Sequence, residues 1–315
     1  MILFCYNTIK WMIQRGGVNK MNGYISVENK KIYFEEYGDN SLPTFLYLHG
    51  GPGVGSYDFN LIQAQRLSSF IHLISIDQRG CLRSDAIEEI EDFSIQNLIN
   101  DFEFIRDHFK IDRWGLIGHS FGGYLAVEYA YQFPDVIEQV VLECPTFDML
   151  ESLQSVVKKA EKLYREDGQD KIADRCKDAY NYSEQELFSI FSEISEKRDQ
   201  VYIRSLNPHF FNDIVEQSEI QHYDWQKQMM FQNKINDQIL KQPVLDKLTN
   251  ITCPVLLIKG KYDPICSELQ TEEFLNKVQN RTVVICVNSA HMPRHEEPEY
   301  FAEAIQAFVK NTLLR

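Results

Sequence analysis

The pentapeptide Gly118-His119-Ser120-Phe121-Gly122 lies between two segments of different periodicity, and it constrains the fold more than any other feature. A short apolar run over 114–117 precedes it, and residues 121–133 have helical spacing. G-x-S-x-G at such a junction is typical of a sharp strand-to-helix turn that presents a serine hydroxyl. Small residues at 118 and 122 relieve the backbone crowding in this turn. The pattern predicts Ser120 as a nucleophile; the alternative is a glycine-rich turn with an unreactive serine.

Short apolar runs alternate with helical patterns on both sides of this turn. The spacing predicts strands over 24–28, 31–37, 44–48, 71–76, 114–117, 137–142, 254–259 and 282–287, and helices over 94–109, 121–133, 268–278 and 298–314. This alternation predicts an α/β fold with a mostly parallel sheet and helices on both faces. It stops between 146 and 244, where the sequence is polar and helical. We therefore predict a core of 21–145 and 245–315 with an inserted helical cap over 146–244.

Residues 1–20 precede the first strand pattern and do not read as a secretory signal. Lys10 interrupts their apolar run, and no small-residue cleavage site follows. We interpret 1–20 as an N-terminal extension ahead of a natural start at Met21. The alternative is a genuine arm packed on the body.

Charge and cysteine content argue against several classes of function. The net charge is −14, which disfavours general binding to nucleic acid or an anionic membrane on electrostatic grounds. The seven cysteines include no C-x-x-C pair, so we expect no disulfide framework, no structural metal and a reducing, cytoplasmic location. No cofactor motif is present, and we expect a small molecule or short peptide as the partner. The sequence leaves the oligomeric state open.

A serine hydroxyl needs a general base, and the base needs an acid that orients it. Asp263 follows the predicted strand 254–259, and His291 follows the last predicted strand, which matches the chain order serine, acid, histidine. Asp148 is the alternative acid, because it follows the preceding strand, and His295 is the alternative base. His49 and His119 flank the predicted active-site turns, where we expect them to hold loops by hydrogen bonds.

A tetrahedral intermediate requires two N–H donors for its oxyanion. The amide of Phe121, next after the nucleophile, should supply one. The glycine-rich loop His49-Gly50-Gly51-Pro52-Gly53 should supply the other, and we choose Gly51 because a glycine lets the backbone approach a substrate closely.

Together these motifs resemble the proline iminopeptidase (prolyl aminopeptidase) family of α/β-hydrolase fold serine peptidases. The resemblance rests on His49–Gly53, Asp77-Gln78-Arg79-Gly80, Gly118–Gly123, Asp263 and His291. It implies an α/β-hydrolase fold and an enzyme that releases an N-terminal residue, typically proline, from short peptides. It also implies that acidic side chains beneath the cap hold the substrate ammonium. Our candidates for that role are Glu143, Glu216 and Glu219.

The chain departs from the family pattern at three places. Leu82 replaces the second glycine after Asp77-Gln78-Arg79-Gly80, Phe121 replaces a tryptophan, and the Trp-x-x-Trp-Glu signature of many family caps is missing. The third departure leaves open a carboxylesterase, lactonase or amidase on the same scaffold. Hydroxynitrile lyase-like chemistry and a non-catalytic binding protein are further alternatives, whereas Ser120 excludes a dehalogenase or an epoxide hydrolase. For Asp77 and Arg79 we expect a charged pair that supports the loop beneath the site.

Overall fold

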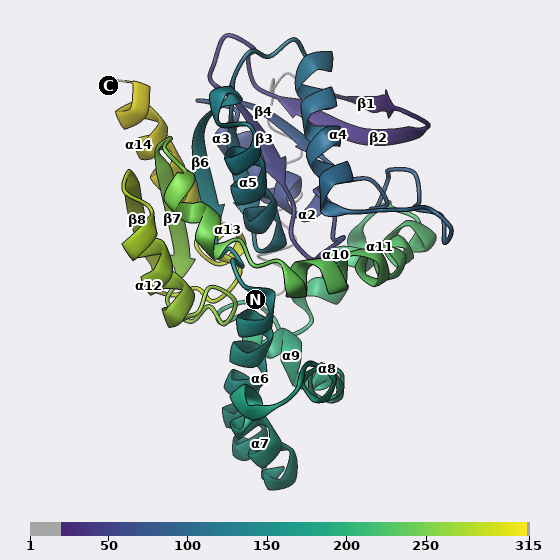
Figure 1. The fold of residues 1–315 in the computed structure, drawn as a ribbon, viewed down its shortest axis with the longest axis vertical. Coiled ribbons are helices and arrows are strands. Elements are labelled where there is room, and N and C mark those ends of the chain that lie inside the picture. Colours follow the sequence, from purple (N-terminus) through teal and green to yellow (C-terminus); the bar gives the residue numbers. More distant parts are fainter. Residues whose placement is uncertain (1–19, 314–315) are drawn as a thin grey trace.

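The computed structural model describes residues 20–313, and one eight-stranded sheet organises them (Figure 1). Only β1–β2 and β2–β4 pair in antiparallel fashion; the remaining pairs are parallel. In their order across the sheet the strands are β1 (Lys20–Val27), β2 (Lys30–Tyr37), β4 (His72–Ile76), β3 (Thr44–Leu48), β5 (Trp114–His119), β6 (Ile137–Glu143), β7 (Val255–Gly260) and β8 (Arg281–Cys286). The predicted α/β fold is confirmed. The turn between the first two strands lies one residue earlier than the predicted bounds 24–28 and 31–37 imply, because Val27 pairs with Lys30.

Helices cover both faces of the sheet because alternate strand residues point to opposite sides. In β3, Leu46 and Leu48 join one apolar cluster, whereas Phe45 and Tyr47 join the other. The first cluster is completed by α4 (Ile95–His108), α5 (Phe121–Gln132), η4 (Leu245–Asn250) and α12 (Glu268–Lys277). The second is completed by α2 (Tyr57–Phe59), η1 (Asn60–Ala64), α3 (Gln65–Leu67) and α14 (Pro298–Leu313). Two short elements, η2 (Pro134–Val136) and α13 (Pro293–Glu296), lie in connections.

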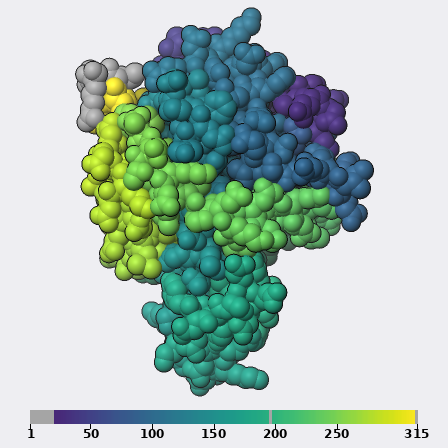
Figure 2. Space-filling model, in the orientation of Figure 1, coloured from purple at the N-terminus to yellow at the C-terminus, as the bar shows by residue number. Residues whose placement is uncertain are grey.

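The segment between β6 and β7 is helical, and it divides into two parts. The first part is a lobe with its own apolar core, which Figures 1 and 2 show projecting from the body. Its helices are α6 (Met149–Glu166), α7 (Asp170–Lys177), η3 (Ala179–Asn181), α8 (Glu184–Glu193) and α9 (Ser195–Tyr202). The second part is α10 (Phe210–Gln217) and α11 (His222–Lys241), and Phe231 of α11 packs into the main core against Phe93 and Phe121. Part of the predicted cap is therefore continuous with the body.

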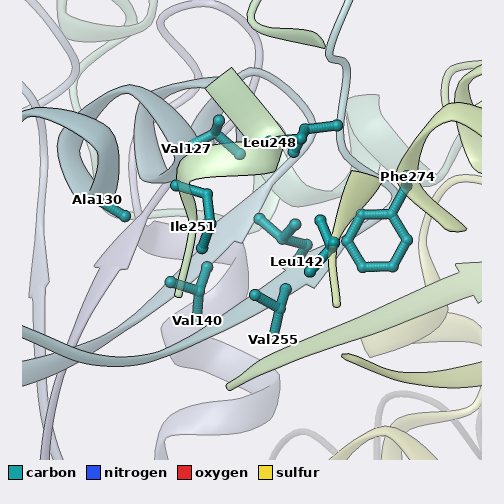
Figure 3. A pocket seen from close by; sticks show the side chains of 9 residues that line it. Val127, Ala130, Val140, Leu142, Leu248, Ile251, Val255 and Phe274 are labelled. Atoms are coloured by element: carbon teal, nitrogen blue, oxygen red, sulfur yellow. The ribbon is translucent and has the colours of Figure 1, made fainter. Parts of the chain in front are cut away.

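An apolar pocket in the core lies between α5, β6, η4, β7 and α12 (Figure 3). Aliphatic side chains and Phe274 line it, and it leaves no room for a water molecule. It is a packing feature and carries no polar group that could bind a substrate. None of the helices between Lys20 and Leu313 combines the length and the hydropathy that a membrane span requires.

Candidate active site

Ser120 occupies a strained turn between β5 and α5. Its φ of 54° and ψ of −118° lie in a region that residues with side chains rarely adopt. Neighbouring backbone over-determines this geometry: Ser120 N donates to Glu143 O at 3.0 Å, and Ser120 O accepts from Thr146 N at 3.2 Å. A Cβ at Gly118 would overlap the carbonyl of Gly122, and a Cβ at Gly122 would overlap the carbonyl of Leu48. The predicted need for small residues in this turn is confirmed.

Asp263 and His291 form a buried hydrogen-bonded pair. Asp263 follows β7 and His291 follows β8, and Asp263 Oδ1 lies 2.8 Å from His291 Nδ1. The two carboxylate oxygens also accept from the backbone N–H groups of Ile265 and Cys266, each at 3.0 Å. These bonds fix the carboxylate and leave His291 Nε2 as the ring nitrogen available for proton transfer.

The turn that carries Ser120 touches the loop that carries His291. His119 Nε2 lies 3.1 Å from His291 O, and the two imidazole rings are 4.7 Å apart. Burial lowers the pKa of His119 well below its usual range, and the charge of Arg294 lowers it further. His119 is therefore a neutral donor that joins the two turns, which agrees with the loop-holding role predicted for it.

The alternative acid and base have other partners. Asp148 is the N-cap of α6 and accepts from Glu151 N at 3.2 Å, which satisfies a helix-terminal donor. His295 lies in α13, and its Nε2 is 3.0 Å from Asp58 Oδ2. His49 Nε2 accepts from Gln78 N at 3.0 Å and so holds the glycine-rich loop, as predicted.

The glycine-rich loop after β3 packs directly on the nucleophile. A Cβ at Gly50 would lie 3.0 Å from Ser120 Cβ, so the loop backbone approaches the serine as closely as a glycine allows. Gly51 has a φ of 119°, a conformation that favours glycine. Phe121 is the first residue of α5, where backbone N–H groups have no partner within the helix. Both donors chosen from the sequence thus belong to segments that border Ser120.

A buried ionic network lies beneath these loops, and the sequence analysis missed it. Arg294 donates to Glu143 from its backbone N at 3.0 Å and from Nη1 at 3.1 Å, and its Nη2 donates to Asp58 at 2.7 Å. Burial raises the pKa of Asp58, but Arg294 and His295 outweigh it and hold that pKa well below its usual range. The network joins α13, which follows His291, to the end of β6, where Glu143 O accepts from Ser120 N, and to α2, which follows the glycine-rich loop.

Asp77 and Arg79 do not pair with each other, so the prediction of that charged pair is wrong. Asp77 instead binds Arg83, with Arg83 Nε 2.6 Å from Oδ2. Arg79 turns the other way and binds Asp101 of α4, also at 2.6 Å. The loop is supported by charge, as expected, but Asp77 and Arg79 belong to different ion pairs.

The three predicted ammonium partners lie in different surroundings. Glu143 is fully buried, and Arg294 engages both of its oxygens. Glu216 is exposed on α10, and Glu219 is exposed just after that helix. Burial raises the pKa of Tyr57, the charge of Arg83 lowers it, and the negative charge of Glu219 raises it. Trp225 also contacts the Tyr57 ring edge-on, at 6.3 Å.

Cys144 lies behind the acid–base pair. Its Sγ and ligand atoms of Asp263 and His291 lie within 4.8 Å of one another, the only such grouping in the part of the chain that the structure describes. The thiol is 3.6 Å from Ala290 O and 3.4 Å from Gly260 N, and burial raises its pKa well above the usual range. Since Asp263 and His291 bind each other, this group is better explained as packing than as a metal site.

Comparison with known proteins identifies the family of the fold. Residues 43–298 match the family described as alpha/beta hydrolase fold, so the chain belongs to that family. It is 26% identical over 311 residues to a proline iminopeptidase of Saccharolobus solfataricus, with 93% of each chain covered. It is 40% identical over 124 residues to a putative proline iminopeptidase of Mycoplasma pneumoniae, a match that spans 39% of this chain and 40% of the relative.

Among solved structures, a proline iminopeptidase-related protein from Thermus thermophilus superposes with a TM-score of 0.75 at 20% identity, covering 93% of this chain and 98% of that one. The family resemblance predicted from the motifs is confirmed.

Proposed function

We propose that this member of the alpha/beta hydrolase fold family is a serine hydrolase with Ser120 as nucleophile, His291 as general base and Asp263 as the acid that orients it. The observation that carries the proposal is the buried 2.8 Å contact between Asp263 and His291, in a loop that His119 joins to the turn of Ser120. The Nδ1–H bond to Asp263 selects the imidazole tautomer whose Nε2 can accept a proton.

In the acylation step, Ser120 Oγ bonds to the substrate carbonyl carbon while its proton moves to His291 Nε2. The backbone N–H groups of Gly51 and Phe121 stabilise the oxyanion that forms. The tetrahedral intermediate then collapses, the bond to the leaving group breaks, and His291 returns the proton to the departing amine or alcohol. Water repeats the sequence on the acyl-enzyme and frees Ser120.

We further propose that the substrate is a short peptide and that the enzyme releases an N-terminal proline or another small apolar residue. The named activity of the relatives supports this specificity. An ammonium desolvated beneath the cap requires a carboxylate partner there. Glu219 is our first choice of the three candidates because its negative charge acts on Tyr57, four residues after the glycine-rich loop. Glu216 is the second choice, and Glu143 is already bound by Arg294.

A carboxylesterase, lactonase or amidase is the second candidate function. The observation that favours it is the exposure of both Glu216 and Glu219, since an ammonium partner is expected to be sheltered from water.

Proline β-naphthylamide, its N-acetylated form and p-nitrophenyl acetate distinguish the two functions. An aminopeptidase cleaves the free prolyl substrate far better than the acetylated one, because only the free substrate carries the ammonium. Equal rates on the two prolyl substrates, with turnover of the ester, would exclude the aminopeptidase and establish the esterase.

A further inference from the structure

The cap contacts the backbone of both members of the acid–base pair. His291 donates its backbone N–H to Tyr202 O, at the end of α9, at 3.0 Å. The Tyr202 ring lies 5.3 Å from the imidazole. On the acid side, Lys159 Nζ of α6 donates to the carbonyls of Tyr262 and Asp263, at 3.1 and 3.0 Å.

One carboxylate joins the cap to the histidine loop. Glu296 Oε1 accepts from the backbone N–H groups of Arg204 and Ser205, at 2.6 and 2.8 Å. Its other oxygen, Oε2, accepts from Ala290 N, the residue before His291, at 2.6 Å. These are charge-assisted bonds to an ionised acceptor, which are stronger than neutral ones.

The same cap segment reaches the acid loop. The Arg204 guanidinium lies 3.9 Å from the centroid of the Tyr262 ring, and Tyr262 immediately precedes Asp263. Tyr262 N in turn donates to Ser289 O at 3.0 Å, which joins the acid loop to the histidine loop. Cap residues 202–205 thus touch both loops, and Glu296 fastens them to the histidine side.

We infer that contacts with the cap hold Asp263 and His291 in position, and that Glu296 and Lys159 are positioning residues. Without the cap contacts, the loops that carry Asp263 and His291 lose the bonds that Tyr202 and Lys159 make to their backbone. A misplacement of about 1 Å at a reacting group can cost on the order of 10²-fold in rate. The inference rests on the hydrolase mechanism proposed above and not on the aminopeptidase specificity.

The chain offers a matched control for each residue. Glu297 neighbours Glu296 and binds the same loop, at Asn288 N and Ser289 Oγ, but the bonds assigned to it do not reach the cap. Lys158 neighbours Lys159 on α6, and its Nζ bonds go to Glu161 and to Lys177 O, both within the cap.

The test measures kcat and KM for p-nitrophenyl acetate, and the rate at which a small neutral organophosphate labels Ser120, in the full-length chain. Neither reagent needs an ammonium partner. We expect Glu296→Gln and Lys159→Met to lower kcat and the labelling rate about 10- to 100-fold with little change in KM. Glu297→Gln and Lys158→Met should change both rates less than about 3-fold.

Two results would overturn the inference. One is an equal loss within each matched pair, which would assign the effect to the loop or the helix itself. The other is a loss confined to the prolyl substrate, which would limit the cap to substrate selection. If Glu296→Gln does not fold, the lysine pair decides the question alone. A Ser120→Ala variant that keeps its turnover would instead refute the hydrolase proposal.

Discussion

The loops at the carboxyl ends of the strands and the cap differ in how firmly they hold their candidate functional residues. Ser120, Asp263 and His291 are 7%, 2% and 6% exposed, and backbone bonds fix each of them. The cap acids Glu216 and Glu219 are exposed. Groups that perform a chemical step need one geometry, and the core supplies it by burial. Groups that select a substrate can sit on a surface that closes around it, so motifs identify the first kind far better than the second.

The largest expected effect tests the core side of this comparison. Ser120→Ala should fold normally and lose turnover by about 10⁶-fold, because the hydroxyl is the attacking group. Alanine also has a Cβ, so the strain at this positive φ is unchanged. The measurement is kcat on the preferred substrate, with organophosphate labelling of the parent protein mapped to Ser120 by mass spectrometry. Retention of half the activity would end the serine-hydrolase proposal.

The second largest loss of kcat is expected at one of two aspartates. Asp263 follows strand β7, and Asp148 caps the first helix of the cap. Asp263→Asn should lower kcat by about 10⁴-fold, because an amide would favour the wrong imidazole tautomer. Asp148→Asn should leave kcat nearly unchanged, because asparagine also caps a helix. Steady-state kinetics on both variants is sufficient. A crippled Asp148→Asn variant beside a mild Asp263→Asn variant would reverse our assignment of the acid.

A smaller effect is expected on the cap side. Glu219→Gln should lower kcat/KM for proline β-naphthylamide by about 30-fold, equivalent to roughly 2 kcal/mol for a lost ammonium partner. Turnover of p-nitrophenyl acetate should not change, since the ester carries no ammonium. Glu216→Gln is the matched control on α10 and should have the lesser effect. If Glu216→Gln were the damaging change, Glu216 and not Glu219 would be the ammonium partner.

The sequence predicted the strands and helices whose apolar residues follow a single periodicity. The strand Thr44–Leu48 was located to the residue, because a short apolar run between turn residues leaves few alternatives. The helical stretch from Tyr57 to Leu67 was missed. It consists of two short α-helices and a π-helix, which do not share one period.

The site shows the same division between local and long-range information. Ser120, Asp263 and His291 each follow a strand, so chain order and strand pattern locate them. Arg294 could not be assigned in this way, because its partners Glu143 and Asp58 lie 151 and 236 residues away. Asp77 and Arg79 were paired because they are neighbours in the sequence, whereas the true partners depend on how the loop turns. Local patterns identify the reacting groups, and only the tertiary structure identifies the charges that support them.

The smallest expected effect is on the free energy of unfolding and not on a rate. It distinguishes His119, which is buried in the core, from His222, which is exposed on the cap. Burial lowers the pKa of His119 well below its usual range, whereas His222 is exposed at the start of α11. In the unfolded chain a histidine has a pKa of about 6.5. As the pH falls below that value, His119 binds a proton in the unfolded state but not in the folded state. The free energy of unfolding therefore decreases as the solution becomes more acidic. At pH 5.5 this loss is about 1.4 kcal/mol relative to pH 7.5.

Urea unfolding of the parent protein and two variants at these pH values measures the contribution of His119. Between pH 7.5 and pH 5.5, the unfolding free energy of His119→Gln should fall by about 1.4 kcal/mol less than that of the parent protein. This difference does not depend on how much the substitution itself lowers stability at pH 7.5. His222→Gln should keep the drop of the parent protein, because the His222 side chain is exposed in the folded chain. An identical drop in His119→Gln and the parent would mean that His119 takes up a proton within the folded core. The nucleophile turn would then be more open to water than its contacts with His291 indicate.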